Sequence, residues 1–559
     1  MNPETSTSST TSSNLKQSSL RWWVLGSLAA ITVLGAFLRF YQLGAHSIGN
    51  TYYAAAVKSM LTSWKNFFFV AFEPGGSVTV DKPPLGLWIQ AASAYLFGVN
   101  GFALALPQAL AGTLSIPLLY HLVRKHFSRL AAHTSALVLA LTPIAIAAER
   151  NNTMDGVLVF VLLLAAWAFL RAVETGKLGV LVLGGFLLGL GFNIKMLQAV
   201  MPLPALYGVY LLGSKHGWGK KLLYLGLTSL VFLIVAFAWV IAVDLTPADQ
   251  RPYIGSSSDN TVLELILGHN GLKRLGLNGS RTGGDGDRAQ VDGGVGSPSG
   301  VFPQDQNLQA YPRTQGQFPW IGSGQNTIPP DQDRPPLGSG QNNRAPDQER
   351  RPLASGPNQP PLGQDGPLQG PGAGGRSSET GSAGLMRLFL EPLVTEASWL
   401  LPLALLGIPV SLAASGWRWP LNKRWLGVIF WSGWLLPSLV YFSATQGLFH
   451  RYYLIMIGPP LAALVGITLD SIHNFWNRRK GWGWTLLLVM SGFTLGFELL
   501  VLSTYPAYFA LPAVISILLW VGAMIWLAFR SRAGWQRNMG YVLVLGALLA
   551  APFTWSVLT

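Results

Sequence analysis

Residues 155–171 read DGVLVFVLLLAAWAFLR, a run in which fifteen uncharged residues separate an aspartate from an arginine. An apolar run of about 20 residues is long enough to cross the hydrocarbon core of a membrane as an α-helix. Comparable segments recur near residues 22–41, 101–123, 130–148, 178–194, 198–213, 222–244, 396–415, 425–443, 452–470, 483–502, 509–529 and 539–557. The sequence therefore predicts an all-α polytopic membrane protein with about 13 transmembrane helices.

The composition of the whole chain supports this class. Of 559 residues, 50% are hydrophobic and only 11% are charged, whereas soluble domains average about 25% charged residues. The chain has no cysteine, which excludes disulfides, thiolate nucleophiles and Cys-ligated metal centres.

A formal net charge of +14 could indicate a nucleic-acid partner, so the location of the excess matters. The polar stretch 277–384 holds ten acidic residues and eight arginines, so the positive excess lies elsewhere. It lies in short loops between apolar segments, as in a membrane topology signal. No nucleic-acid partner is predicted.

The positive-inside rule favours a topology in which the N-terminus and every second loop lie in the cytoplasm. The basic residues then gathered inside are Lys16, Arg21, Arg124, Lys125, Arg129, Arg171, Lys177, Lys215, Lys220, Lys221, Arg418, Lys423, Arg424, Arg478, Arg479, Lys480, Arg530, Arg532 and Arg537. Two long loops, 42–100 and about 245–397, face outward in this topology.

Five parts of the chain are expected. They are a disordered cytoplasmic N-terminus (1–20), a transmembrane module that includes the outer loop 42–100 (21–244), an ordered start of the second outer loop (245–276), a Gly/Pro/Gln-rich disordered stretch (277–384) and a C-terminal transmembrane module (385–559).

The first outer loop predicts two amphipathic helices. From residue 52 to 64, apolar side chains fall at helical spacing, at Tyr53, Val57, Met60, Leu61 and Trp64. Pro83-Pro84 then opens a second helical stretch, LGLWIQAASAYLF. Both helices are expected in the outer headgroup plane, although packing against the bundle fits the same pattern.

Between these helices lies EPGGSVTVDKPP, residues 73–84, with a carboxylate next to an ammonium at Asp81-Lys82. This pair can place a base or a metal ligand beside a phosphate-binding cation. The alternative is structural, because an aspartate just before two prolines can cap a helix N-terminus.

Other ionisable residues collect on the same predicted outer side. The loop ERNNTMD brings Glu149, Arg150 and Asp155 to a membrane boundary, and Lys195 lies between two apolar segments. Charged groups there are costly unless they are paired or used. The alternatives are a helix cap for Asp155, a solvated pair for Glu149-Arg150 and snorkelling for Lys195.

The pair His450-Arg451, followed by two tyrosines, also falls on this side and suits a phosphosugar head group. An ordinary aromatic belt with one cation is the alternative.

At these residues the sequence resembles the GT-C superfamily of polyprenyl-phosphate-sugar-dependent glycosyltransferases, in particular its bacterial protein O-mannosyltransferase and aminoarabinose transferase branch. The resemblance rests on Tyr-Tyr-Ala (52–54), Asp-Lys-Pro-Pro-Leu (81–85), Arg-x-x-x-x-Asp (150–155) and a lysine in G-x-x-x-K-x-x-x-A (191–199). The distal segments VLELILGHNGLKRL, SWLLPLALLGI and FHRYYLIMIGPPLAALVGI resemble a subfamily of bacterial mannosyltransferase-like proteins.

The resemblance implies a GT-C type bundle in the bacterial plasma membrane, with an extracytoplasmic active site. The implied reaction is an inverting transfer of a hexose from a polyprenyl phosphate to a protein, lipid or cell-wall hydroxyl. The family resemblance favours mannose as the hexose. Substrate-binding roles are carried over or expected at Asn50, Tyr53, Lys82, Arg150, Lys195, His450 and Arg451.

The sequence departs from the family at the expected general base. The family has Asp-Glu before the Tyr-Ala helix, whereas this chain has Gly49-Asn50. The candidate catalytic carboxylates are therefore Asp81, then Glu73, Asp155 and Glu149. A divalent metal ion held by Asp81 and His269 is a further option.

Two rival functions stay open at this point. A transporter or flippase of lipid-linked sugars would need polar residues and broken helices at the bilayer midplane. A non-catalytic scaffold in envelope assembly is compatible with the absence of Asp-Glu.

Overall fold

The computed structural model describes residues 8–45, 48–269, 380–417, 419–446, 449–478, 480–530 and 534–558. In these ranges the chain is helical, and its only extended pairings are isolated bridges of Ala71 with Thr79 and of Val78 with Tyr253. Ten helices are long and apolar enough to cross a membrane, or eleven if one bent pair counts as a single span. The predicted all-α multi-pass fold is confirmed.

Every predicted apolar segment contains a helix. The long helices are α1 (Ser8–Phe40), α5 (Gly101–Arg124), α8 (Asp155–Thr175), α9 (Leu178–Lys195), α11 (Trp218–Asp244), α15 (Lys423–Ala444), α16 (Gly458–Arg478), α17 (Lys480–Ser503), α18 (Pro506–Arg530) and α19 (Gly534–Leu558). Two predicted segments form the shorter helices α10 (Leu203–Gly213) and α14 (Leu401–Ser415).

The predicted span 130–148 is bent rather than straight. It consists of α6 (Arg129–Ala140) and α7 (Pro143–Glu149), which meet at an angle of 54°. Pro143 lacks the N–H needed to continue the helical ladder, so a new helix begins there. At the N-terminus, α1 already begins at Ser8, whereas disorder is predicted up to residue 20.

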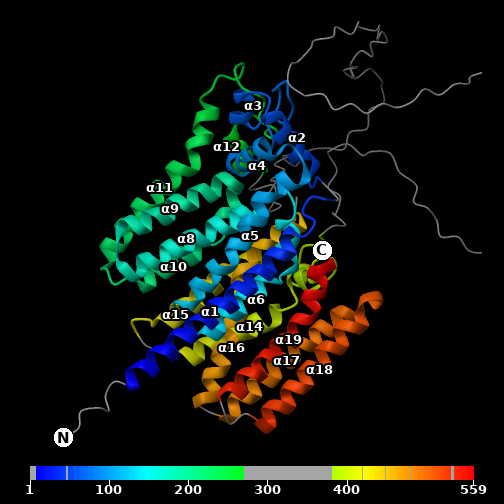
Figure 1. Ribbon diagram of the computed structural model, residues 1–559. Helices are drawn as coiled ribbons and strands as arrows, with labels where there is room; N and C mark the ends of the chain where they lie inside the picture. The colour runs from blue at the N-terminus through cyan, green and yellow to red at the C-terminus, as the bar shows by residue number, and fades with distance from the viewer. Residues whose placement is uncertain are drawn as a thin grey trace, which may run out of the picture. The chain divides into compact units, whose positions relative to one another are not determined.

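The first outer loop forms three helices, α2 (Thr51–Met60), α3 (Trp64–Phe69) and α4 (Pro84–Phe97). Figure 1 shows them, together with α12 (Val262–Glu264), grouped at one end of the long helices α8, α9 and α11. The stripe predicted over residues 52–64 is divided, because α2 ends at Met60 and Ser63 caps α3. Trp64 is consequently exposed.

The start of the second outer loop packs on the first outer loop. The N–H of Thr79 donates to the carbonyl of Tyr253 over 2.8 Å, and the N–H of Tyr253 donates to the carbonyl of Ser77 over 2.8 Å. Asp244 accepts from the N–H of Val262, which begins α12. The predicted low-complexity stretch 277–384 lies outside the described residues except for its last five.

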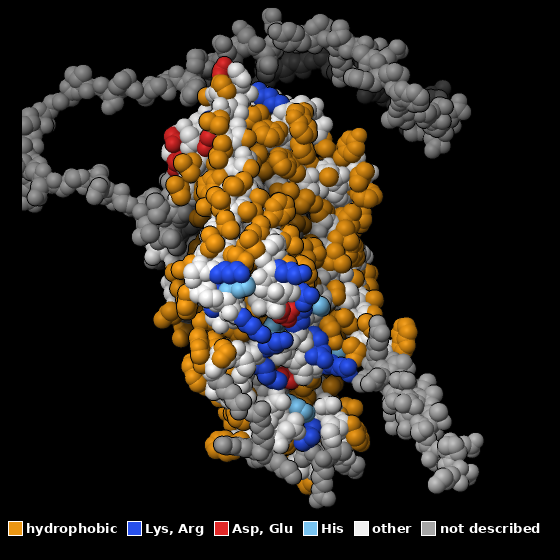
Figure 2. Space-filling model, turned by 90° about the vertical axis from the view of Figure 1, so that its left-hand side faces the viewer, with side chains coloured by type: hydrophobic (Ala, Val, Ile, Leu, Met, Phe, Trp, Pro, Cys, Tyr) orange, Lys and Arg blue, Asp and Glu red, His pale blue; other side chains and the backbone are white. Residues whose placement is uncertain are grey.

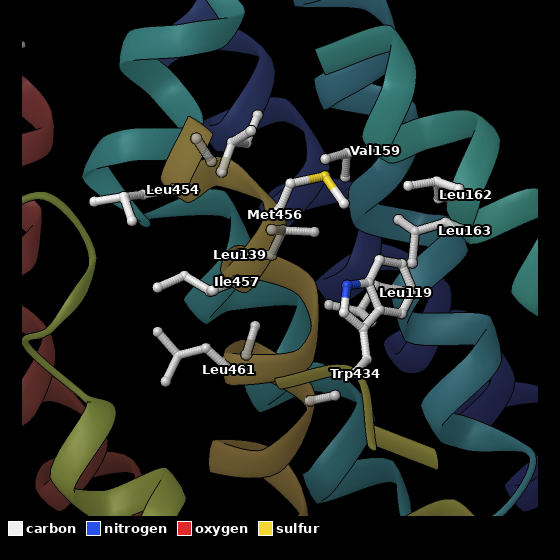
Figure 3. Packing of buried hydrophobic residues seen from close by; sticks show 14 of the residues in the cluster. Leu119, Leu139, Val159, Leu162, Leu163, Trp434, Leu454, Met456, Ile457 and Leu461 are labelled. Atoms are coloured by element: carbon white, nitrogen blue, oxygen red, sulfur yellow. The ribbon is translucent and has the colours of Figure 1, made fainter. Parts of the chain in front are cut away.

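The interior of the bundle is apolar and brings residues 451–457 against α7 and α8. These residues form the 3₁₀ helix η5 (Arg451–Ile457), which leads into α16. Figure 3 shows side chains of η5 among those of α5, α6, α8 and α15, at Met456, Ile457, Leu119, Leu139, Val159 and Trp434. This packing places η5 against α7 and α8. Two tyrosines of η5, Tyr452 and Tyr453, lie beside Lys195 at the end of α9, just before the 3₁₀ turn η1 (Met196–Val200).

The basic loops predicted as cytoplasmic meet at the other end of the helices. Lys125, after α5, lies 3.3 Å from the carboxylate of Glu174 at the end of α8. The ring of His216, before α11, hydrogen-bonds the carbonyl of Gly176 over 2.9 Å. Figure 2 shows Lys and Arg side chains gathered in one region beside a broad hydrophobic surface.

Candidate functional site

A buried ion pair joins the start of α8 to the end of α9. The Lys195 ammonium lies 2.6 Å from Oδ1 of Asp155, and the two side chains are 6% and 0% exposed. The other carboxylate oxygen, Oδ2, is buried and has no hydrogen-bond partner among the described residues. The ammonium also lies 4.1 Å and 4.8 Å from the ring centroids of Tyr453 and Tyr452, within the range of cation–π attraction.

A second ion pair stands in the first outer loop, where Lys82 bonds the carboxylate of Asp81. The residue that caps α4 is Pro83, which makes no side-chain cap bond, so Asp81 does not serve as that cap. The Asp81 N–H donates to the Tyr52 hydroxyl over 3.3 Å. The Asp81 side chain keeps 12% of its surface exposed.

Lys82 and Lys195 line one pocket. Its other lining residues are Pro83, Met196, Leu197, Gln198 and Tyr441. Two lysines from separate elements, each beside an aspartate, thus face a common space. Such an arrangement can hold an anionic group between the two cations while carboxylates lie nearby.

The first turn of α2 lies near both aspartates. Burial raises the pKa of the Tyr53 hydroxyl well above its ordinary value, and the charges of Asp81 and Asp155 raise it further. Burial, and then Asp81, also raise the pKa of the Tyr52 hydroxyl. Both hydroxyls therefore stay protonated at neutral pH and can donate hydrogen bonds.

Glu149 has a different environment, although it lies in the same loop as Asp155. Its Oε2 accepts from Nε of Arg39 over 2.5 Å, and both side chains are almost completely buried. Arg39 also donates to the carbonyls of Gly35 and Ala140 over 3.0 and 3.2 Å. This pair joins α1 to the break between α6 and α7.

Arg150 and the following asparagines also hold the backbone. Arg150 donates to the carbonyls of Leu38 and Tyr41, both over 2.8 Å, at the end of α1. Asn152 accepts from the N–H of Asn50 over 2.6 Å and donates to its carbonyl over 2.9 Å. The Asn50 side chain in turn caps α2 by accepting from the Tyr53 N–H.

The remaining predicted site residues, Glu73, His450 and Arg451, are not among the residues that line the pocket. Glu73 accepts from the N–H groups of Gly75 and Ser77 in an exposed turn, and hydrogen bonds from Ser77 lower its pKa. The His450 ring stacks on Tyr452 with centroids 5.2 Å apart. Arg451 lies 3.6 Å from the carboxylate of Glu396.

The sequence interpretation missed three contributors to this region, namely Asn152, Gln198 and Arg39. Asn152 stands in the NNT segment after Arg150, and Gln198 stands three residues after Lys195, so both lie near predicted residues. Arg39 is separated from Glu149 by 110 positions. The only sequence signal for Arg39 was a charged residue at the end of an apolar segment.

The departure from Asp-Glu has a local structural basis. Gly49 has φ +80°, and a Cβ atom there would lie 2.5 Å from Oδ1 of Asn152. A side chain at position 49 therefore conflicts with the clamp that Asn152 forms on Asn50.

No group of three His, Asp or Glu side chains suited to a metal ion occurs in the described ranges. The prediction that Asp81 and His269 share a metal ion is not tested, because the His269 side chain lies outside the described part of the chain.

Known proteins match this chain over most of its length. A family model described as dolichyl-phosphate-mannose-protein mannosyltransferase matches residues 81–241. "Putative mannosyltransferase YycA" of Bacillus subtilis (strain 168) is 38% identical over 556 residues, covering 95% of this chain and 76% of that protein. "Putative mannosyltransferase YkcB" of the same strain is 37% identical over 560 residues, covering 95% and 74%.

The fold also matches a solved structure, that of ArnT from Cupriavidus metallidurans bound to undecaprenyl phosphate. The TM-score is 0.51 at 17% sequence identity, and the match covers 96% of this chain and 77% of that chain. The matched family segment includes both ion pairs of the pocket. The chain therefore belongs to the GT-C superfamily of polyprenyl-phosphate-sugar-dependent membrane glycosyltransferases.

Proposed function

We propose that this glycosyltransferase moves a hexose, with mannose as the first choice, from a polyprenyl phosphate to an acceptor hydroxyl outside the cytoplasm. The observation that carries the proposal is the convergence of Lys82 and Lys195 on one pocket, with Asp81 and Asp155 beside them. The names of the Bacillus relatives support mannose. The undecaprenyl phosphate bound to ArnT supports a lipid phosphate as ligand.

The position of the pocket supports an extracytoplasmic reaction. Asp155 begins α8 and Glu174 lies near its end, where the basic loops gather. A helix of about 20 residues spans roughly 30 Å, the thickness of the hydrocarbon core. Because the basic end is expected in the cytoplasm, the pocket opens on the outer side of the bacterial plasma membrane.

The proposed reaction is a single displacement at the anomeric carbon of the sugar. The acceptor oxygen forms a bond to that carbon, and the bond from the carbon to the phosphate oxygen breaks. The leaving lipid phosphate takes the electron pair, while the acceptor proton passes to a carboxylate of the enzyme. Lys82 and Lys195 stabilise the charge that develops on the phosphate.

Asp81 is the carboxylate best placed to take this proton. It retains exposed surface in the outer loop, so an acceptor hydroxyl from outside can reach it. Asp155 is completely buried, and Lys195 holds one of its oxygens. We assign Asp155 to the orientation of Lys195, and Glu149 and Arg150 to the support of the surrounding loops.

Turnover by the purified, full-length protein in proteoliposomes tests this function. Polyprenyl phosphates that carry different radiolabelled hexoses are supplied with candidate protein, lipid and glycan acceptors. We expect sugar transfer and equimolar release of lipid phosphate, with the mannosyl donor giving the highest rate. Movement of intact donor across the bilayer without release would support a flippase, and neither event with any donor would support a scaffold.

A further inference from the structure

Gln198 has an amide that nothing in the described protein satisfies. The side chain is 4% exposed, and both Nε2 and Oε1 are buried without a hydrogen-bond partner among the described residues. Gln90 and Gln108 are buried too, but each keeps one bond: Gln90 donates to the carbonyl of Asn152, and Gln108 accepts from the N–H of Val157. An unsatisfied buried amide costs free energy, so its retention requires a reason.

The local backbone places Gln198 at the pocket. Gln198 belongs to η1, the 3₁₀ turn that connects α9 to α10, and it lines the pocket with Lys82 and Lys195. Met196, between Lys195 and Gln198, has φ +26° and ψ −116°, a conformation that L-residues rarely adopt. Strain of this kind persists mainly where function requires it. The strained turn presents Lys195 and Gln198 to the same space.

The hydrogen-bonding chemistry of the amide selects one part of the donor. A phosphate offers only acceptors, so it would use Nε2 and leave Oε1 without a partner. The two lysines already provide positive donors for that phosphate. A sugar hydroxyl both donates and accepts, so hydroxyl groups of a hexose can satisfy both ends of a carboxamide.

We propose that Gln198 is a sugar-recognition residue, whose amide binds hydroxyl groups of the donor hexose while Lys82 and Lys195 hold the phosphate. The proposal rests on the proposed function, because it requires a lipid-phosphate-linked sugar in this pocket. It assigns two subsites to the pocket. The lysines bind the anionic phosphate, and Gln198 of η1 binds the uncharged hydroxyl groups of the sugar.

Binding measurements with two lipids test this division. Purified full-length wild type, Q198M, the double variant K195M/D155N and Q250M are titrated with polyprenyl phosphate and with polyprenyl-phosphate mannose. The double variant is used because K195M alone would leave Asp155 buried without its cation. Methionine keeps the length of glutamine and removes the unsatisfied amide, so Q198M should melt no lower than wild type. Gln250, an exposed glutamine in the outer loop, provides the matched control.

We expect Q198M to weaken binding of the mannosyl lipid about 10-fold or more, the loss of two neutral hydrogen bonds, and to leave binding of the bare lipid phosphate unchanged. K195M/D155N should weaken binding of both ligands, and Q250M should weaken binding of neither. Equal weakening of both lipids by Q198M would overturn the proposal, because Gln198 would then contact the phosphate or support the pocket. Unchanged binding of both lipids would overturn it as well.

The same titration separates this inference from the proposed function. If wild-type protein binds neither lipid, the proposed donor is wrong. If wild type binds both lipids and Q198M does not discriminate between them, only the role of Gln198 is wrong.

Discussion

The ion pairs Arg39–Glu149 and Lys195–Asp155 are both buried, yet their surroundings differ. Arg39 donates to carbonyls of α1 and α6 as well as to Glu149, so the first pair is enclosed by backbone. The second pair lies at the pocket, under two tyrosine rings, with Oδ2 of Asp155 lacking a partner among the described residues.

This contrast shows that burial of an ion pair does not by itself indicate a role in the reaction. A buried ion pair is weak evidence for stability, because desolvation of both charges offsets their attraction. It is also weak evidence for catalysis when hydrogen bonds occupy every group. What distinguishes Lys195–Asp155 is a pocket and an unmade hydrogen bond, and not burial itself. Substitutions at the ion pairs of this region test the distinction.

Asp81→Asn is expected to have the largest effect. The pair Asp81–Lys82 is the third ion pair of the region, and its carboxylate remains partly exposed. Loss of the base should slow transfer about 10²- to 10⁴-fold, while donor binding stays near wild type. Steady-state rates with the labelled mannosyl lipid measure this.

Glu73→Gln serves as the matched control for Asp81→Asn. Glu73 holds only an exposed turn, so transfer should stay near the wild-type rate. A larger loss in Glu73→Gln than in Asp81→Asn would move the base to Glu73.

Removal of both charges of the pocket pair is expected to have the next largest effect. The double variant Lys195→Met with Asp155→Asn leaves no buried charge uncompensated, so the protein should remain folded in the membrane. Transfer should fall about 10²- to 10³-fold, because a cation that stabilises the leaving phosphate is lost. Activity close to wild type in this variant would remove Lys195 from the mechanism.

At the enclosed pair Arg39–Glu149, substitutions should change stability and leave transfer intact. Arg39→Met alone leaves Glu149 buried without its cation, and should destabilise the protein by about 3–5 kcal/mol. The double variant Arg39→Met with Glu149→Gln should recover most of this stability and retain transfer. Thermal unfolding in detergent and turnover of the same samples check both parts. A folded but inactive double variant would show that Glu149 takes part in the reaction.

Much of the fold could be predicted because its signals are local. Apolar runs of membrane length mark the long helices, whereas the bend at Pro143 between α6 and α7 was not predicted. The prediction of one helix from residue 52 to 64 was wrong, because α2 ends at Met60 and Ser63 caps a new helix, α3, although the apolar stripe continues in the sequence. Helical spacing alone carries no information about such a cap.

The site could be predicted in part because the topology collects its residues. Asp81 and Lys82 fall in the predicted outer loop 42–100, Asp155 and Lys195 fall at outward ends of predicted segments, and the structure brings them together. The partners of Glu149 and Arg150 could not be inferred, since both contact α1, more than 100 positions away. Gln198 gave no signal because an uncharged amide among apolar residues resembles an ordinary interior position.

Arg150, in the loop between α7 and α8, tests whether a charge that bonds backbone carbonyls is structural, as at Arg39, or binds the lipid phosphate, as proposed for Lys195. Its guanidinium donates to the carbonyls of Leu38 and Tyr41, groups that the end of a helix leaves without intrahelical partners. Arg150→Gln should therefore lower the melting temperature slightly and keep the transfer rate near wild type. A charge-assisted bond to the lipid phosphate would instead make the loss of rate about 10- to 100-fold. Rates of Arg150→Gln measured beside Lys125→Gln, a change at the opposite end of the helices, distinguish a phosphate contact from a support for α1.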